Sequence, residues 1–100
     1  MPGFGLNARV IETVSYEISN RKNAHRLLTR AEFEVMHGNL TVAEDLLREA
    51  VAELERTCRQ VNTDLAVAMH SLATVLEPQG KLIEAGKLRE QVTTLLAPPQ

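Results

Sequence analysis

Apolar residues recur every three or four positions along most of the chain, the spacing that lines one face of an α-helix. No stretch alternates apolar and polar residues over the length of a β-strand. The pattern therefore predicts an all-α protein of about five helices. Their expected ranges are about 7–20, 24–37, 41–58, 65–77 and 83–96.

The first two helices are expected to be separate elements. Asn7 suits the N-cap position of a helix with one apolar face. That face consists of Val10, Ile11, Val14 and Ile18. Residues 20–23, with the sequence Asn-Arg-Lys-Asn, interrupt the apolar spacing, and Asn23 can cap the helix that follows. A short corner is therefore predicted at 20–23.

The end of the second helix and the start of the third are marked by their residue types. Gly38 is expected to end the second helix in the left-handed conformation, which glycine adopts without steric cost. Thr41 is followed by Glu44 three residues later, which matches the capping box that begins a helix. Asn39 is an alternative cap for the same helix.

The helix expected over 65–77 is apolar on more than one side. A helix with such a wide apolar face is normally packed between neighbours, so this one is predicted to lie in the middle of the structure. Pro78 cannot donate a backbone hydrogen bond and is expected to end or kink the helix near Glu77.

A shift of 42 residues superposes one part of the chain on another. Gly38 and Gly80 are 42 positions apart. The same shift superposes Ala31 on Ala73, Leu40 on Leu82, Ala43 on Ala85 and Leu46 on Leu88. A fixed period of this size is typical of stacked helical hairpins.

The segments 31–43 and 73–85 each contain a small residue, then Gly, Leu and Ala in that order. In this they resemble the tetratricopeptide repeat. The long connection over 55–62 is similar to that of the longer-period variant in kinesin light chains. The resemblance covers about 24–96 and implies antiparallel hairpins stacked as a short α-solenoid. The sequence departs from the family at Pro78 and at the aromatic positions of the first helices. Those positions hold Leu27, Glu34, Met69 and Leu76.

The resemblance also implies how a single domain over 1–100 is organised. By the 42-residue offset, residues 7–20 are expected to form an N-terminal helix that covers the exposed side of the second helix. A first hairpin is expected over 24–60. A second hairpin is expected over 63–96, followed by a disordered tail at 97–100.

In tetratricopeptide proteins the first helices of the hairpins line a concave groove that receives a peptide. The corresponding positions here are His25, Leu28, Glu32, Val35, Val67, His70, Thr74 and Glu77. They contain neither the Lys nor the Asn of the carboxylate clamp found in chaperone-binding members. A groove with apolar side chains and two acids is expected to suit an apolar or basic segment.

Composition restricts the classes of partner. One hundred residues with 44% hydrophobic content fit one compact domain. A net charge of −2, with eleven basic and thirteen acidic residues interleaved, opposes nucleic-acid binding, and no Lys or Arg lies in 65–77 for a DNA-reading helix. The chain begins without a signal-peptide pattern, and no apolar run approaches the roughly 18 residues that cross a bilayer. A soluble, cytoplasmic protein without membrane contact is therefore expected.

The residues that could bind a metal do not have a metal-binding spacing. His25, His37 and His70 have no second ligand at the i+4 spacing of zinc-binding helices, so no metal or cofactor is expected. Cys58 is the single cysteine and is interpreted as a small apolar residue on a helix face.

No catalytic arrangement is predicted either. Ser71 and His70 are adjacent on a helix and should point about 100° apart, which disfavours a nucleophile-base pair. Four carboxylates on the second and third helices are interpreted as solvated helix faces rather than as an acid-base pair. They are Glu32, Glu34, Glu44 and Asp45. We therefore do not expect an enzyme.

The expected function is protein-protein interaction, as an adaptor or an accessory subunit that binds a protein or peptide segment in the groove. The alternative is a structural or regulatory subunit that docks, or associates with a second copy, through its C-terminal edge near Leu95 and Leu96. That edge is expected to be uncapped.

Overall fold

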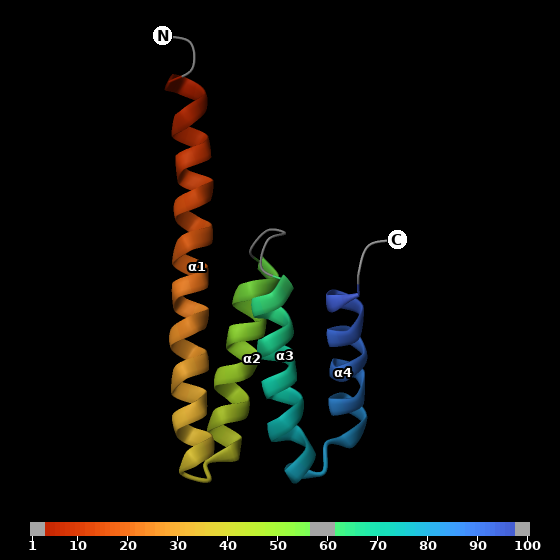
Figure 1. Cartoon of the computed structure of the whole chain (residues 1–100). Coiled ribbons are helices and arrows are strands. Elements are labelled where there is room, and N and C mark those ends of the chain that lie inside the picture. The colour runs from red at the N-terminus through yellow and green to blue at the C-terminus, as the bar shows by residue number, and fades with distance from the viewer. Residues whose placement is uncertain (1–3, 57–61, 98–100) are drawn as a thin grey trace.

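The computed structural model describes the backbone of residues 4–56 and 62–97, and the side chains of 19–56 and 63–97. Within these ranges the protein is all-helical and has no strand. Its elements are α1 (Phe4–Met36), α2 (Leu40–Arg56), α3 (Asn62–Leu76), the short 3-10 helix η1 (Glu77–Gln79) and α4 (Leu82–Leu96). Helices α1 and α2 pack together as one antiparallel pair, α3 and α4 as a second, and α2 packs on α3 (Figure 1).

Helix α1 is one continuous helix of 33 residues, so the predicted corner at 20–23 is wrong. The described part of the chain has four α-helices rather than five. No Gly or Pro interrupts the chain between Leu6 and His37, and Asn costs a helix interior only a few tenths of a kcal/mol. Burial of Asn20 and Ala24 on one side of α1 accompanies the continuous helix.

The N-terminal half of α1 therefore does not form a separate covering helix. Because α1 begins at Phe4, Asn7 lies inside it and is not its N-cap. Figure 1 shows that this half of α1 extends beyond the ends of the other helices. The apolar face predicted for residues 10–18 lies outside the described side chains.

The turn after α1 is closed by a left-handed glycine, as predicted. Gly38 has φ of 78°. Its N–H donates to the carbonyl oxygen of Val35 at 3.0 Å, and the N–H of Asn39 donates to the carbonyl oxygen of Glu34 at 2.9 Å. This pair of hydrogen bonds is the Schellman motif, which satisfies carbonyl groups at a helix C-terminus.

The turn after η1 repeats the same geometry 42 residues later. Gly80 has φ of 81°, and its N–H donates to the carbonyl oxygen of Glu77 at 3.0 Å. The N–H of Lys81 donates to the carbonyl oxygen of Leu76 at 3.1 Å. Each bond has its counterpart in the first turn, so the internal repeat in the sequence corresponds to a repeated local structure.

Small residues lie buried at equivalent places in the two helix pairs. Ala31 and Ala43 of the first pair and Ala73 and Ala85 of the second are at most 1% exposed. Side chains of this size let helices approach closely. Larger apolar side chains fill the space between the helices, namely Leu47, Leu54, Leu65, Met69, Leu72, Val75, Leu76 and Leu88.

Helix α3 lies between α2 and α4, which confirms the prediction from its wide apolar face (Figure 1). It buries Leu65, Ala66, Ala68, Met69, Leu72, Ala73, Val75 and Leu76. The α-helix ends at Leu76, and Pro78 lies within η1, as expected for a residue that lacks a backbone N–H.

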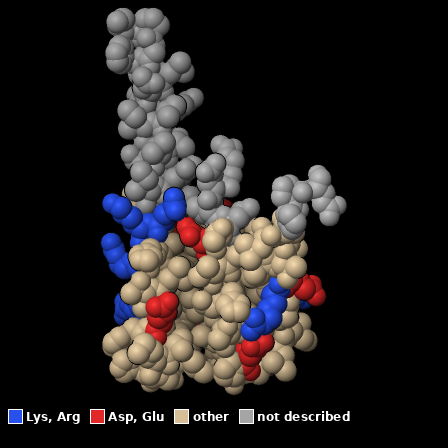
Figure 2. Space-filling model, in the orientation of Figure 1, with Lys and Arg blue, Asp and Glu red and all other residues tan. Residues whose placement is uncertain are grey.

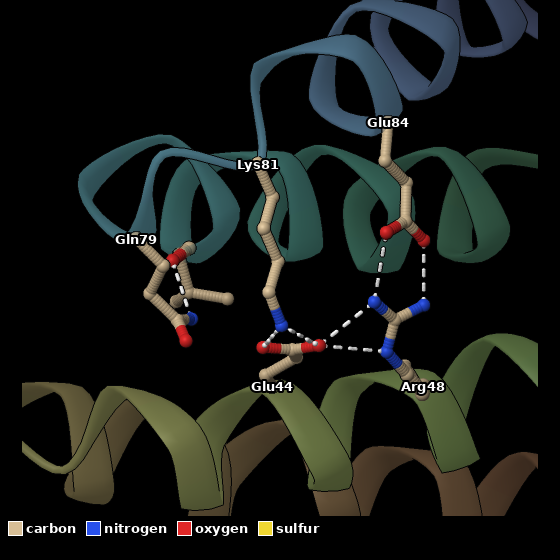
Figure 3. A network of polar contacts seen from close by, with 6 residues as sticks. Glu44, Arg48, Gln79, Lys81 and Glu84 are labelled. Atoms are coloured by element: carbon tan, nitrogen blue, oxygen red, sulfur yellow. Dashed lines mark hydrogen bonds and ion pairs between the residues drawn. The ribbon is translucent and has the colours of Figure 1, made fainter.

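A buried carboxylate connects α2 to the start of α4 (Figure 3). Glu44 is only 5% exposed, so its interpretation as part of a solvated face is wrong. Both of its oxygens accept hydrogen bonds from Lys81 Nζ at 3.0 Å, and one accepts from Arg48 Nη2 at 2.7 Å. Arg48 also donates to both oxygens of Glu84, at 2.6 and 2.9 Å.

The charges of this network determine how Glu44 ionises. Burial by itself would raise the pKa of Glu44, but hydrogen bonds from Lys81 and Arg48 outweigh that effect and hold the pKa below its ordinary value. Glu44 is therefore a structural anion.

Helix α2 begins at Leu40, directly after the alternative cap Asn39.

Candidate peptide-binding groove

A groove of about 710 Å³ lies between α1 and α3, over α2. Its walls come from residues at helical spacing on each helix, because positions three or four apart share one face. Seven of the eight predicted groove residues line it, namely His25, Leu28, Glu32, Val35, Val67, His70 and Thr74. The structure thus brings together side chains that lie up to 49 positions apart in the sequence.

The floor of the groove is apolar and its rim carries exposed apolar side chains. Ala31, Leu47 and Val75 are buried at its base. At the rim, Val35 is 40% exposed, Val67 is 52% exposed and Met36 also lines the groove. No Lys or Arg is among the described residues that line it.

Two hydroxyl groups in the groove are occupied by the protein's own backbone. Thr29 donates to the carbonyl oxygen of His25 at 3.0 Å, and Thr74 donates to that of His70 at 2.9 Å. At these two positions the threonine methyl groups, and not the hydroxyl protons, are therefore available to contact a bound segment.

Glu77, the eighth predicted residue, does not line the groove. Arg89 of α4 donates to both of its oxygens, at 2.8 and 3.1 Å, and these hydrogen bonds hold the pKa of Glu77 below its ordinary value. The prediction that Glu77 is one of two acids in the groove is therefore wrong, because Glu77 is paired with Arg89 outside it. Asp64, which the sequence reading missed, lines the groove and accepts a hydrogen bond from Arg21 at 3.3 Å.

A second hollow, of about 1000 Å³, adjoins the groove and is basic. The two share His25, Leu28, Thr29 and Asp64. Four cations line the second hollow, namely Arg21, Lys22, Arg26 and Arg30. Figure 2 shows Lys and Arg side chains gathered over α1, with acidic atoms close by.

This basic hollow was not predicted because residues 20–23 were interpreted as a corner. On a continuous helix, Lys22, Arg26 and Arg30 follow one another at intervals of four residues and share one face. That interval was the signal in the sequence that could have identified the hollow.

The three histidines lie outside any cluster of possible metal ligands in the described part of the chain. Within the described residues, no group of three or more His, Cys, Asp or Glu side chains could hold a metal ion. His37 donates from Nδ1 to the carbonyl oxygen of Phe33 at 2.8 Å, and the two rings lie 4.2 Å apart. Cys58 lies outside the described residues, as does the predicted tail beyond Ala97.

Comparison with protein-family models, curated proteins and solved structures finds no match to this chain. What the protein does must therefore be inferred from the groove and its surroundings. Among the described helices, none is both long and apolar enough to cross a membrane.

Proposed function

We propose that the protein is a binding scaffold that holds a segment of a partner protein in the groove between α1 and α3, as an adaptor or an accessory subunit. The observation that carries the proposal is the groove itself, with its buried apolar floor and the exposed Val35 and Val67 at its rim. Apolar side chains exposed along a concave surface mark a binding site more often than isolated ones do.

The proposed repeat architecture supports this function. The matched turns at Gly38 and Gly80 and the buried alanines are what stacked hairpins of the tetratricopeptide kind would need. In such an array α1 and α3 would be the first helices of successive hairpins. A partner segment would then place apolar anchors at helical or extended spacing against Leu28, Val35 and Val67.

The exposed face of α4 supports the groove over the C-terminal edge as the docking surface. The exposed residues of α4 are Leu82, Ile83, Gly86, Lys87, Glu90, Gln91, Thr93, Thr94 and Leu96. The apolar ones lie at the two ends of the helix and are separated by polar residues, so they do not form a continuous apolar stripe for a second copy or another subunit.

The polar groups of the groove also favour binding over catalysis. His25, His70 and Glu32 are exposed to solvent, whereas catalytic acids and bases are usually enclosed in a pocket. The hydroxyls of Thr29 and Thr74 already donate to backbone carbonyl oxygens.

The proposal is tested with peptides selected from a random display library on the full chain. We expect Val35→Lys and Val67→Lys each to weaken binding of the selected peptides by about tenfold or more, since a charge would enter an apolar contact. Ile83→Lys is the matched control, because Ile83 is also aliphatic and is 80% exposed on α4.

Fluorescence anisotropy with labelled peptides measures the affinities, and circular dichroism confirms that each variant is folded. Selected peptides that bind all three variants as tightly as the wild type, or that lose affinity only for Ile83→Lys, would show that the groove is not the docking surface.

A further inference from the structure

The face of α1 that lines the basic hollow carries three cations without an anionic partner in the described structure. These are Lys22, Arg26 and Arg30, all exposed. Elsewhere most of the described cations are paired: Arg48, Arg56, Lys81 and Arg89 each form an ion pair with a carboxylate. The unpaired charges are thus concentrated in one place.

The spacing of these cations costs the free protein stability. Like charges four residues apart on a helix repel one another and destabilise it. Lys22 with Arg26 and Arg26 with Arg30 are two such pairs on α1. An anionic ligand over the hollow would relieve this repulsion.

We infer that the partner segment carries acidic residues beside its apolar anchors, with the acids over Lys22, Arg26 and Arg30. This inference rests on the proposed function, because the basic hollow and the apolar groove share His25, Leu28, Thr29 and Asp64 and can be filled by one chain. Lys22 and Arg30 are separated by about 12 Å along the helix axis, at 1.5 Å per residue. That length matches about two turns of a partner helix or about four extended residues.

The distribution of charge favours a protein segment over a nucleic acid. The chain as a whole carries a net charge of −2, and the carboxylate of Glu32 lines the groove next to the hollow. The carboxylate of Asp64 lines both the groove and the hollow and is paired with Arg21. A uniformly anionic backbone leaving the hollow would meet those carboxylates. A segment with acids at one end and apolar residues at the other fits both parts of the surface.

The same charges give the bound segment a direction. Acids at its basic-hollow end are attracted, while acids at the end near Glu32 and Val35 meet a carboxylate and an apolar rim. Moving the acidic block from one end of a peptide to the other should therefore change its affinity.

The test uses random twelve-residue peptides selected on the full chain, followed by anisotropy measurements with Arg26→Gln/Arg30→Gln. We expect the selected peptides to have Asp or Glu on one side of an apolar block. They should lose about tenfold in affinity to the double variant, and also when salt is raised from about 0.05 M to about 0.5 M. Lys87→Gln, which removes an exposed cation of α4, is the control and should leave affinity unchanged.

The outcomes separate this inference from the proposed function. Peptides that need Val35 and Val67 but lack acids, bind the double variant normally and tolerate reversal of their order would overturn the acidic-segment inference alone. Peptides that ignore the groove variants would overturn both. A short DNA or RNA duplex, or a phosphatidylserine vesicle, that binds more tightly than any selected peptide and is lost in the double variant would also overturn it. A double variant that melts several degrees below the wild type would assign the cations a structural role, against the inference.

Discussion

Glu44 shows how one residue can be misread from its place in the sequence. On a helical wheel it lies at the border of the polar face, between Val51 and Glu55. In the structure it is buried, in contact with Arg48 of its own helix and with Lys81 from the turn before α4. The Arg48 contact lies within α2, whereas the Lys81 contact depends on the turn before α4 lying against α2. A local pattern cannot show which cation will reach a carboxylate 37 residues away.

We expect Glu44→Gln to lower the free energy of unfolding by roughly 1–3 kcal/mol, because Lys81 and Arg48 would lose a charged acceptor while remaining partly desolvated. Urea denaturation measures the change. Asp45→Asn, at an exposed position on the same helix, is the control and should change stability by less than about 0.5 kcal/mol. Equal effects of the two substitutions would mean that the network does not hold α4 in place.

Glu44 should also make stability depend on pH. Desolvation opposes its ionisation, but the hydrogen bonds from Lys81 and Arg48 keep its folded-state pKa below the ordinary value of 4.5. The unfolded chain therefore binds a proton before the folded chain does as pH falls. The stability that Glu44 contributes is present above about pH 4.5 and is lost as the pH drops towards the folded-state pKa.

Denaturation curves recorded from pH 6 down to about pH 3 should accordingly show a smaller acid-induced loss of stability in Glu44→Gln than in the wild type. The residual loss in the variant is expected from Glu84 and Glu77, whose pKa values are held down by Arg48 and Arg89. Parallel curves for the two proteins would contradict the assignment.

At the scale of the helices, substitution by Ala should destabilise the protein at the two turn glycines and stabilise it at a third glycine. Gly38→Ala and Gly80→Ala place a side chain at φ of 78° and 81°, which costs about 1–2 kcal/mol each. Gly86→Ala lies within α4 and should stabilise the protein by about 0.5–1 kcal/mol. Because an added Cβ meets nothing within 4 Å at any of the three, backbone conformation alone decides the sign. Thermal melts measure all three, and a stabilising Gly80→Ala would contradict the repeated turn.

The continuity of α1 has an equally direct test at Asn23. Inside a helix, Asn23→Ala should stabilise the protein by about 0.5 kcal/mol because Ala has the higher helix propensity. At the N-cap of a separate helix, the same change would cost about 1 kcal/mol. We expect the stabilising result in urea denaturation, since Asn23 lies in the interior of α1 and is exposed.

Three of the four α-helices could be predicted from the sequence, as could both turn glycines, because periodicity and φ preference are local properties. The residues from His25 to Thr74 were placed together by the resemblance to tetratricopeptide repeats, and they line one groove in the structure. The continuity of α1 was not predicted, because Asn and Arg are tolerated both in helix interiors and in corners. The basic hollow was missed with it, because the four-residue interval from Lys22 to Arg30 indicates one shared face only when the helix is continuous. Tertiary burial of Asn20 and Ala24, which is invisible in a single sequence, accompanies the outcome.

At the scale of the whole molecule, the two helix pairs should unfold together. A pair of helices alone buries too little apolar surface to be stable, and α3 packs on both α2 and α4. Leu72 is 3% exposed in α3, so Leu72→Ala should leave a cavity costing about 2–5 kcal/mol. Hydrogen exchange should then speed up in α2 as well as in α3 and α4, because the stability of neighbouring pairs is shared. The control is Leu96→Ala, at an exposed position at the end of α4, which should leave hydrogen exchange in α2 unchanged. If α2 stayed as protected in Leu72→Ala as in the wild type, the first helix pair would be stable without the second.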